Sequence, residues 1–271
     1  MDNRPIGVFD SGLGGLTAVR ELRLLLPNES IIYFGDTARV PYGTRSRETL
    51  LRYVKQDIGF LRTFDLKTVL VACGTASTTV LESVRGDYDL PIFGVVEPSA
   101  AAAVAASATG RIGLIGTPAT VRSGAFERRV RQLNPETQVF SVPCPLLVPL
   151  VENGRTSPDD PVLQLVLEEY LAPLQAQNID VLILGCTHYP LLSEAIARQM
   201  GPAVRLIDSG AAIAQYTAAT LRQNGALAAG TDAGSLRCFV SDQPHDFARL
   251  ASLFLRCDTE PEVSRVDIEQ Y

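Results

Sequence analysis

Two short apolar stretches, VLVACGTASTT at 69–79 and VLILGCTHYP at 181–190, constrain the fold of this chain more than any other feature. A run of β-branched residues and leucine that ends in small residues is typical of a parallel strand that is buried on both faces and leads into a helix. When the two stretches are aligned without a gap, Thr75 matches Thr187, and the cysteines at 73 and 186 differ by one position. The alignment predicts two equivalent strand ends, each carrying a thiol.

Strand and helix patterns alternate along the chain, and the alternation restarts near its middle. The first series of apolar strands is expected at 6–9, 31–34, 69–72 and 91–96. The second series, which opens with RIGLIG as the first opens with PIGVFD, is expected at 111–116, 138–142, 181–184 and 204–207. We therefore predict an α/β fold of two similar doubly wound lobes with mainly parallel sheets, related by a pseudo-twofold axis.

The last part of the chain contains further helices and a strand, which we expect to return to the first lobe. The first lobe is then discontinuous and comprises residues 1–96 and 210–271, and the second comprises residues 97–209. Lobes of this architecture bind ligands at the carboxyl ends of their strands. The predicted site is therefore a cleft between the lobes, with Cys73 on one side and Cys186 on the other.

Composition and charge argue against several classes of partner. A formal net charge of −6 argues against nucleic acid or an anionic membrane as a partner. No stretch has the length and apolarity of a membrane span, and the start of the chain lacks the pattern of a signal peptide. Five cysteines, an odd number in a chain of 271 residues, do not suggest a disulfide framework. We predict a reduced cytoplasmic protein.

Two opposed thiols suggest a specific kind of chemistry. Backbone N–H groups at a helix N-terminus favour the thiolate form of a cysteine placed there. If one thiol is ionised and the other protonated, the pair can remove a proton from one face of a carbon and return another to the opposite face. Buried cysteines that only pack in a core remain the alternative. The duplication favours the catalytic interpretation, because both cysteines follow equivalent strands.

Three more residues are candidates for acid–base work. His188, one of only two histidines, follows Cys186 in the same loop. Asp10 ends the first strand, where an N-terminal cap or a turn carboxylate is an equally good interpretation. Glu152 lies in the expected loop 143–154, where taken alone it is most simply a turn residue.

Nucleotide and metal sites are less well supported. The glycine loop Gly12-Leu13-Gly14-Gly15 has Thr17 at the last position of a dinucleotide fingerprint, which leaves a nucleotide-binding oxidoreductase only as an alternative. Cys73 together with Cys186 and His188 lacks the paired spacing of a zinc site, so we predict no metal.

A pyridoxal phosphate enzyme needs a lysine for its Schiff base, and the chain has only Lys55 and Lys67, both in unsuitable positions. We therefore predict chemistry without a cofactor. An anionic substrate would then be held by backbone amides at helix starts. The hydroxyl groups expected to help are those of Ser11, Thr75 and Thr187.

In combination, the motifs resemble those of the glutamate racemases in the aspartate/glutamate racemase family, which make D-glutamate for bacterial peptidoglycan without a cofactor. The matching segments are GVFDSGLGGLTA (7–18), FGDTARVPYG (34–43), VACGTAS (71–77), VPLVENG (148–154), LGCTHYPLL (184–192) and IDSG (207–210). They cover nearly the whole chain. The resemblance implies two α/β lobes around a cleft and two-base proton transfer at the Cα atom of glutamate.

The resemblance also implies roles for individual residues. Cys73 and Cys186 match the catalytic thiols, which act on D-glutamate and L-glutamate respectively. Asp10 matches a carboxylate associated with the first thiol, and Glu152 and His188 match groups linked to the second. The positions that match substrate contacts are Asp10, Ser11, Tyr42, Gly43, Gly74, Thr75, Thr187 and His188. Because members of the family are often dimers, the resemblance also implies a homodimer.

One position departs from the family pattern. The residue after the first cysteine is usually asparagine, whose amide contacts the substrate, and here it is Gly74. Loss of one such hydrogen bond costs about 0.5–1.5 kcal/mol, which weakens binding several-fold to about tenfold. Racemisation of another amino acid such as aspartate, or of a hydantoin, therefore stays an alternative, as does a non-catalytic ligand-binding module.

Overall fold

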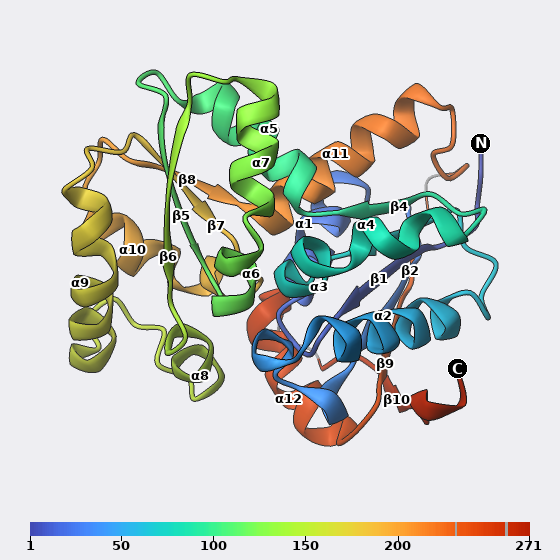
Figure 1. The fold of residues 1–271 in the computed structure, drawn as a ribbon. Helices are drawn as coiled ribbons and strands as arrows, with labels where there is room; N and C mark the ends of the chain where they lie inside the picture. The colour runs from blue at the N-terminus through green and yellow to red at the C-terminus, as the bar shows by residue number, and fades with distance from the viewer. Residues whose placement is uncertain (231, 258–259) are drawn as a thin grey trace.

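Two parallel β-sheets with helices packed around them form the molecule in the computed structural model, which describes residues 1–230, 232–257 and 260–271 (Figure 1). The first sheet has the order β10-β9-β2-β1-β3-β4 and the second the order β6-β5-β7-β8. The strands of the first sheet are β1 (Ile6–Asp10), β2 (Ile31–Gly35), β3 (Thr68–Val71), β4 (Ile92–Gly94), β9 (Leu236–Val240) and β10 (Val263–Arg265). Those of the second are β5 (Arg111–Gly116), β6 (Gln138–Pro143), β7 (Val181–Leu184) and β8 (Arg205–Asp208).

The two sheets share one topology. The order β2-β1-β3-β4 recurs as β6-β5-β7-β8, and every strand pair is parallel. The prediction of two similar parallel α/β lobes is thereby confirmed. Strands β9 and β10 extend the first sheet after the chain has passed through the second. The lobe boundaries at residues 96 and 210 stay a prediction.

The helices are longest where they cover the sheets and shortest at the strand ends. Their bounds are α1 (Leu16–Leu25), α2 (Arg47–Leu61), α3 (Gly74–Thr79), α4 (Leu81–Val84), α5 (Val96–Ala106), α6 (Pro118–Ser123), α7 (Ala125–Leu133), α8 (Leu147–Glu152), α9 (Pro161–Gln175), α10 (Ser193–Met200), α11 (Ser209–Gln223) and α12 (Pro244–Leu255). Single 3₁₀ turns are η1 (Thr37–Arg39), η2 (Tyr42–Thr44), η3 (Arg85–Asp87), η4 (Tyr189–Leu192) and η5 (Ile268–Gln270). None of the helices in the described ranges is long and apolar enough to cross a membrane.

Two segments differ from the sequence-based expectation. The helix expected over 75–85 is divided into α3 and α4 at Val80, whose φ of −132° is not helical. The run of β-branched residues around this position weakens the helix, because such side chains are crowded against the preceding turn. The expected loop 143–154 contains α8, which is a helix of six residues.

The central strands β3 and β7 are buried along their whole length, which explains their uninterrupted apolar sequences. Helices cover both faces of the sheets, so alternation of polar and apolar residues is absent. Full burial of one aliphatic side chain contributes about 1.5–3 kcal/mol, and these strands supply several. The sheets therefore form rigid supports for the residues that follow each strand.

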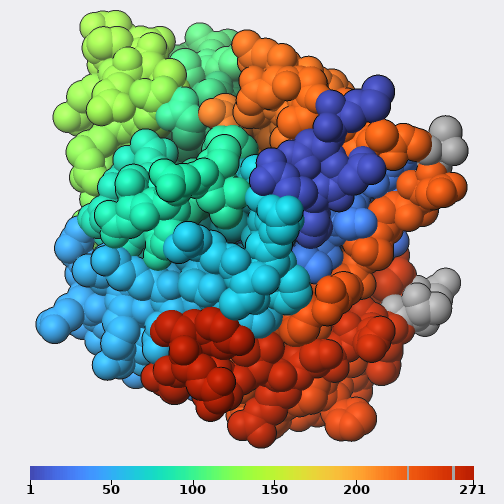
Figure 2. Space-filling view, turned by 90° about the vertical axis from the view of Figure 1, so that its right-hand side faces the viewer, coloured from blue at the N-terminus to red at the C-terminus, as the bar shows by residue number. Residues whose placement is uncertain are grey.

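Lys67 connects three parts of the first lobe at the amino end of β3. Its Nζ atom lies 2.6 Å from Oε2 of Glu29, and both side chains are almost completely buried. Lys67 also donates hydrogen bonds to the carbonyl oxygens of Asp2 (2.6 Å) and Ala226 (3.0 Å). Figure 2 shows the N-terminal residues packed beside the segment that follows α11. The role of Lys67 is therefore structural, at the opposite end of β3 from Cys73.

We expect Lys67→Met to lower the free energy of unfolding by about 3–5 kcal/mol, because it leaves the Glu29 carboxylate buried without its partner. Urea denaturation measures this loss. The matched control is Lys55→Met at the only other lysine, whose pair with Asp87 is half exposed. Such a pair contributes at most about 1 kcal/mol. Equal losses in the two variants would contradict the structural role of Lys67.

Candidate active site

A cavity of about 310 Å³ lies where residues that follow strands of both sheets meet. Its walls come from the segments directly after β1, β3, β5, β6 and β7, as expected for a site at the carboxyl ends of parallel strands. All the predicted site residues except Asp10 line it, namely Ser11, Tyr42, Gly43, Cys73, Gly74, Thr75, Glu152, Cys186, Thr187 and His188. A larger cavity of about 720 Å³, lined by α3, α4, α5 and α7, contains no cysteine. The chemistry of the lining, rather than volume, identifies the site.

The first thiol caps a helix. Cys73 precedes α3, and its Sγ atom accepts a hydrogen bond from the backbone N–H of Ala76 at 3.5 Å. The hydroxyl of Ser11 lies 3.6 Å from the same sulfur. Burial, reinforced by the charge of Asp10, raises the pKa of the Cys73 thiol to about 12. Cys73 therefore holds its proton at neutral pH.

The second thiol faces a histidine. Sγ of Cys186 lies 4.0 Å from Nδ1 of His188, and Nε2 of His188 lies 3.0 Å from Oε1 of Glu152. Burial lowers the pKa of His188, but the hydrogen bonds to Cys186 and Glu152 outweigh it and raise the pKa to about 10. The ring of Phe254 meets the imidazole edge-on at 5.5 Å. His188 is therefore an imidazolium at neutral pH, with a partner on each ring nitrogen.

Asp10 is placed differently from the expectation. Its carboxylate is fully buried and does not line the cavity. It accepts hydrogen bonds from the N–H of Gly12 at 3.0 Å and from the hydroxyl of Thr187 at 3.4 Å. Burial raises its pKa, and its charge in turn raises that of the Cys73 thiol. Asp10 thus acts on Cys73 through the electric field of its charge. Its hydrogen bond with Thr187 connects β1 to the loop after β7.

Glycines let the two lobes approach closely beside the cavity. A Cβ atom on Gly14 would lie 2.1 Å from Oγ1 of Thr187, and one on Gly74 would lie 2.3 Å from the carbonyl oxygen of Gly185. Both distances are far below contact distance, so any side chain at these positions would force the lobes apart. Gly14 therefore packs a lobe contact in the place where a dinucleotide fingerprint would hold pyrophosphate. The alternative of a nucleotide site has no support in this geometry.

Sequence reasoning missed part of the lining. Thr117 follows β5, and its Oγ1 atom lies 3.0 Å from Oγ1 of Thr75. The repeat of PIGVFD as RIGLIG could have identified it, because it places Thr117 opposite Ser11 in the duplication. Val148 and Glu152 both line the cavity, as residues four apart on α8 do when they share a face. A helical interpretation of 147–152 would have revealed this.

The cavity offers little cationic charge from long side chains. None of the described residues that line it is lysine or arginine, so His188 provides its side-chain positive charge. Backbone N–H groups in the first turn of α3 have no partner within the helix and point towards the cavity end of β3. Among the described residues, no group of three or more His, Cys, Asp and Glu side chains could hold a metal ion. The arrangement suits an anionic substrate that exchanges protons with two sulfurs.

Comparisons with known proteins agree with this chemistry. Residues 17–217 match the family model described as Asp/Glu/Hydantoin racemase. A relative from Geobacter metallireducens named glutamate racemase is 45% identical, over 93% of this chain and 93% of its own length.

Two solved structures are similar over nearly the whole chain. Glutamate racemase isoform RacE1 from Bacillus anthracis superimposes with a TM-score of 0.94 at 37% identity, and 98% of each chain is covered. Glutamate racemase from Francisella tularensis in complex with D-glutamate has a TM-score of 0.91 at 38% identity, with both chains covered completely. The chain therefore belongs to the Asp/Glu/Hydantoin racemase family, as a member of its glutamate racemase branch.

Proposed function

We propose that this chain interconverts L-glutamate and D-glutamate by proton transfer at Cα between Cys73 and Cys186, without a cofactor. Three relatives with 44–47% identity over nearly the whole chain are named glutamate racemase. The observation that carries the proposal is that both thiols line one cavity, because stereoinversion requires two acid–base groups on opposite faces of one carbon. The enzyme is an isomerase.

The reaction of L-glutamate begins at Cys186. Its thiolate, stabilised by the adjacent imidazolium of His188, takes the Cα proton, and the electron pair of the C–H bond stays on the substrate as a carbanion conjugated with the carboxyl group. Cys73 then donates its proton to the opposite face and becomes a thiolate. Each turnover therefore exchanges the protonation states of the two sulfurs, and the reverse reaction starts at Cys73.

Substrate carboxylates are held mainly by neutral donors. We assign this role to backbone N–H groups at Gly74 and Thr75 and to the hydroxyls of Ser11, Thr75 and Thr187. Helix N-termini bind anions in this way because their first N–H groups lack acceptors. Tyr42 and Gly43 close the cavity from the loop after β2.

Racemisation of aspartate or of a hydantoin is the second candidate, and two observations favour it. The family description covers all three substrate classes, and Gly74 stands where the family asparagine would contact the substrate. The same two thiols would serve each substrate. Turnover of both enantiomers of glutamate, aspartate and a hydantoin by the purified protein separates these candidates.

The cellular role follows from the product. D-Glutamate is a building block of bacterial peptidoglycan, so we assign the chain to cell wall biogenesis in the cytoplasm. A homodimer is the proposed assembly, and light scattering of the purified protein tests it.

Replacing either thiol tests the mechanism directly. We expect Cys73→Ala and Cys186→Ala each to lower kcat/KM by at least about 10³-fold, because one acid–base group is lost. In deuterated water, Cys73→Ala should slowly exchange the Cα proton of L-glutamate only, and Cys186→Ala that of D-glutamate only, since one reactive sulfur remains in each. The control is Cys238→Ala on β9, a buried cysteine outside the cavity. Normal racemisation in either single variant would rule out the two-base mechanism.

The close lobe contact at Gly74 generates a second prediction. Gly74→Ala places its Cβ 2.3 Å from the carbonyl oxygen of Gly185 and must separate the lobes by about 1 Å. A misplacement of this size can reduce turnover by about 10²-fold. Because Gly74→Asn introduces the same Cβ, we expect it to lower kcat/KM rather than improve binding. Gly86→Ala is the control, because no atom of the described residues lies within 4 Å of a Cβ added there. Unchanged turnover in Gly74→Ala would show that the lobes do not need this contact.

The pH dependence should report on His188. The imidazolium of His188 loses its proton as pH rises through about 10, and the positive charge beside Cys186 is lost with it. We therefore expect kcat/KM to decline as pH rises through about 10. Glu152→Gln removes one of the groups that raise the pKa of His188, so the decline should move to lower pH. Glu194→Gln, at an exposed pair with Arg198, should leave the profile unchanged.

A further inference from the structure

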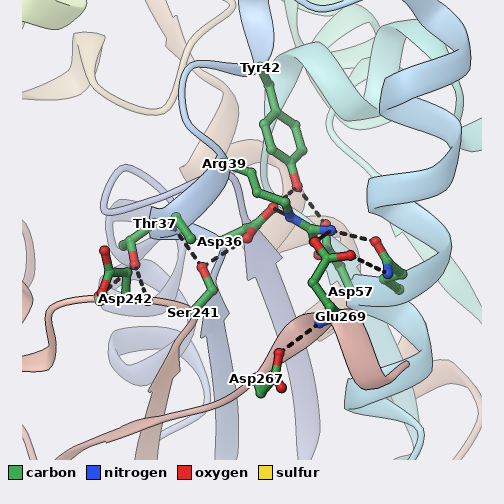
Figure 3. Close-up of polar contacts among 11 residues, drawn as sticks. Asp36, Thr37, Arg39, Tyr42, Asp57, Ser241, Asp242, Asp267 and Glu269 are labelled. Atoms are coloured by element: carbon green, nitrogen blue, oxygen red, sulfur yellow. Dashed lines mark hydrogen bonds and ion pairs between the residues drawn. The ribbon is translucent and has the colours of Figure 1, made fainter.

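A buried polar cluster lies beneath the loop 40–44, and the ring of Tyr42 points from this loop into the cluster (Figure 3). Asp36 follows β2, Arg39 and Tyr42 belong to the turns η1 and η2, and Asp57 lies on α2. The side chains of both aspartates are completely buried, and the Arg39 side chain is 7% exposed. None of these groups was assigned a role above, apart from the contact of Tyr42 with the cavity.

Arg39 joins the two carboxylates. Its Nε atom donates to Oδ2 of Asp36 at 2.7 Å, and its Nη2 atom donates to Oδ1 of Asp57 at 2.8 Å. Its remaining nitrogen, Nη1, donates to Oε1 of Gln56 at 2.5 Å. The guanidinium also lies 4.2 Å above the ring of Tyr53. Arg39 is therefore fixed on every side.

The hydroxyl of Tyr42 lies between the same two carboxyl groups. It is 2.5 Å from Oδ2 of Asp36 and 2.8 Å from Oδ2 of Asp57. A phenol has one proton and can donate only one hydrogen bond. Two short contacts between three oxygens need two protons, so the second proton must belong to a carboxyl group.

The remaining contacts decide which carboxyl group holds that proton. Asp36 already accepts hydrogen bonds from Arg39 and, on Oδ1, from the hydroxyl of Ser241 at 2.9 Å. That hydroxyl accepts the N–H of Ala38 at 2.8 Å, so its own proton is free to go to Asp36. Asp36 thus has the surroundings of an ionised carboxylate. Within the described part of the chain, Oδ1 of Asp57 accepts a hydrogen bond from Arg39 alone, and the partner of Oδ2 is the Tyr42 hydroxyl. Oδ2 can therefore carry a proton and donate it to Tyr42.

Charge balance leads to the same assignment. Arg39 can neutralise one buried carboxylate, and a second unpaired one would be costly to bury. Among the described residues, further charged or titratable groups near the cluster are Tyr53 and Arg52 on α2, where Arg52 lies 5.4 Å over the Tyr53 ring, and Glu269 on η5, 3.5 Å from Arg39 but 66% exposed. Burial, and then the neighbouring Asp36, raise the pKa of Asp57 well above its usual range.

We propose that Asp57 is protonated at neutral pH and that the resulting hydrogen-bond chain Asp57–Tyr42–Asp36, closed by Arg39, positions the loop 40–44 at the substrate cavity. Every residue of this loop lines the cavity, and a Cβ on Gly43 would lie 3.2 Å from Thr117 of the other lobe. Asp57 does not touch the cavity and is a positioning residue. The expected effect of Asp57 on turnover depends on the proposed racemisation, whereas its protonation state does not.

Asparagine is the neutral isostere of a protonated aspartate. Replacing Asp57 with asparagine therefore distinguishes a protonated from an ionised carboxyl group at this position. Asp57→Asn can donate Nδ2–H to Tyr42 and accept from Arg39, and we expect its KM for glutamate to stay within about threefold of the original protein. Asp57→Ala and Tyr42→Phe break the chain and should raise KM by about tenfold or more with a smaller change in kcat. Asp65→Asn, at an exposed aspartate, controls for the substitution itself. If Asp57→Asn raises KM as much as Asp57→Ala, the carboxyl group is ionised and the proposal fails.

Two further measurements do not depend on catalytic activity. The infrared difference spectrum between the original protein and Asp57→Asn should contain the C=O stretch of a carboxylic acid at neutral pH, and a carboxylate band in its place would overturn the proposal.

The second measurement is the pH dependence of the unfolding free energy. Because folding raises the pKa of Asp57, this residue makes its full contribution to the stability of the folded state below its ordinary pKa of about 4, and that contribution is lost as pH rises through the raised pKa. The unfolding free energy of the original protein should therefore fall relative to that of Asp57→Asn as pH increases. Parallel pH dependences of the two proteins would contradict protonated Asp57, whether or not glutamate is the substrate.

Discussion

The site depends on how closely the two sheets can bring their strand ends together. At Gly74 and Gly185 the backbones of the two lobes meet with no room for a Cβ atom, and at Gly14 the first lobe packs directly on Thr187. The hydroxyl of Thr17 adds a hydrogen bond of 3.1 Å to the carbonyl oxygen of Thr187. Packed interiors do not deform continuously, so such contacts fix the lobe separation within narrow limits. Without them, two thiols on separate lobes would have no defined distance from one substrate carbon.

Much of this arrangement could be predicted from the sequence, because strands buried on both faces have a clear signal. The strands that precede Cys73 and Cys186 were located within a residue, and their equivalence indicated the duplicated fold. Helix α8 was missed because three prolines between 143 and 149 suggested a loop. Pro149 is nevertheless compatible with the first turn of α8, where N–H groups have no helical acceptor.

Contacts between distant segments could not be predicted in the same way. Asp57 is 15 residues from Tyr42 and lies on a helix whose pattern gives no sign of a polar partner. The burial of Asp10 depends on Thr187, which is 177 residues away. Sequence placed Asp10 at the end of its strand, but whether a carboxylate there faces substrate or solvent is decided by the opposite lobe. Gly74, predicted to weaken binding, has a second role at the lobe contact that one sequence alone cannot show.

The duplication supplies equivalent positions for the thiols, and residues outside its symmetry make them chemically different. Asp10 corresponds to Gly116, and His188 to Ala76, so the negative group near Cys73 and the positive group near Cys186 have no counterparts. This asymmetry cannot favour one enantiomer, because L-glutamate and D-glutamate have equal free energies and kcat/KM must be equal in both directions. Its effect is to give the two sulfurs different surroundings. Burial and the charge of Asp10 keep the proton on Cys73, whereas Cys186 lies beside the imidazolium of His188, a difference that a strictly symmetric pair of thiols would not have.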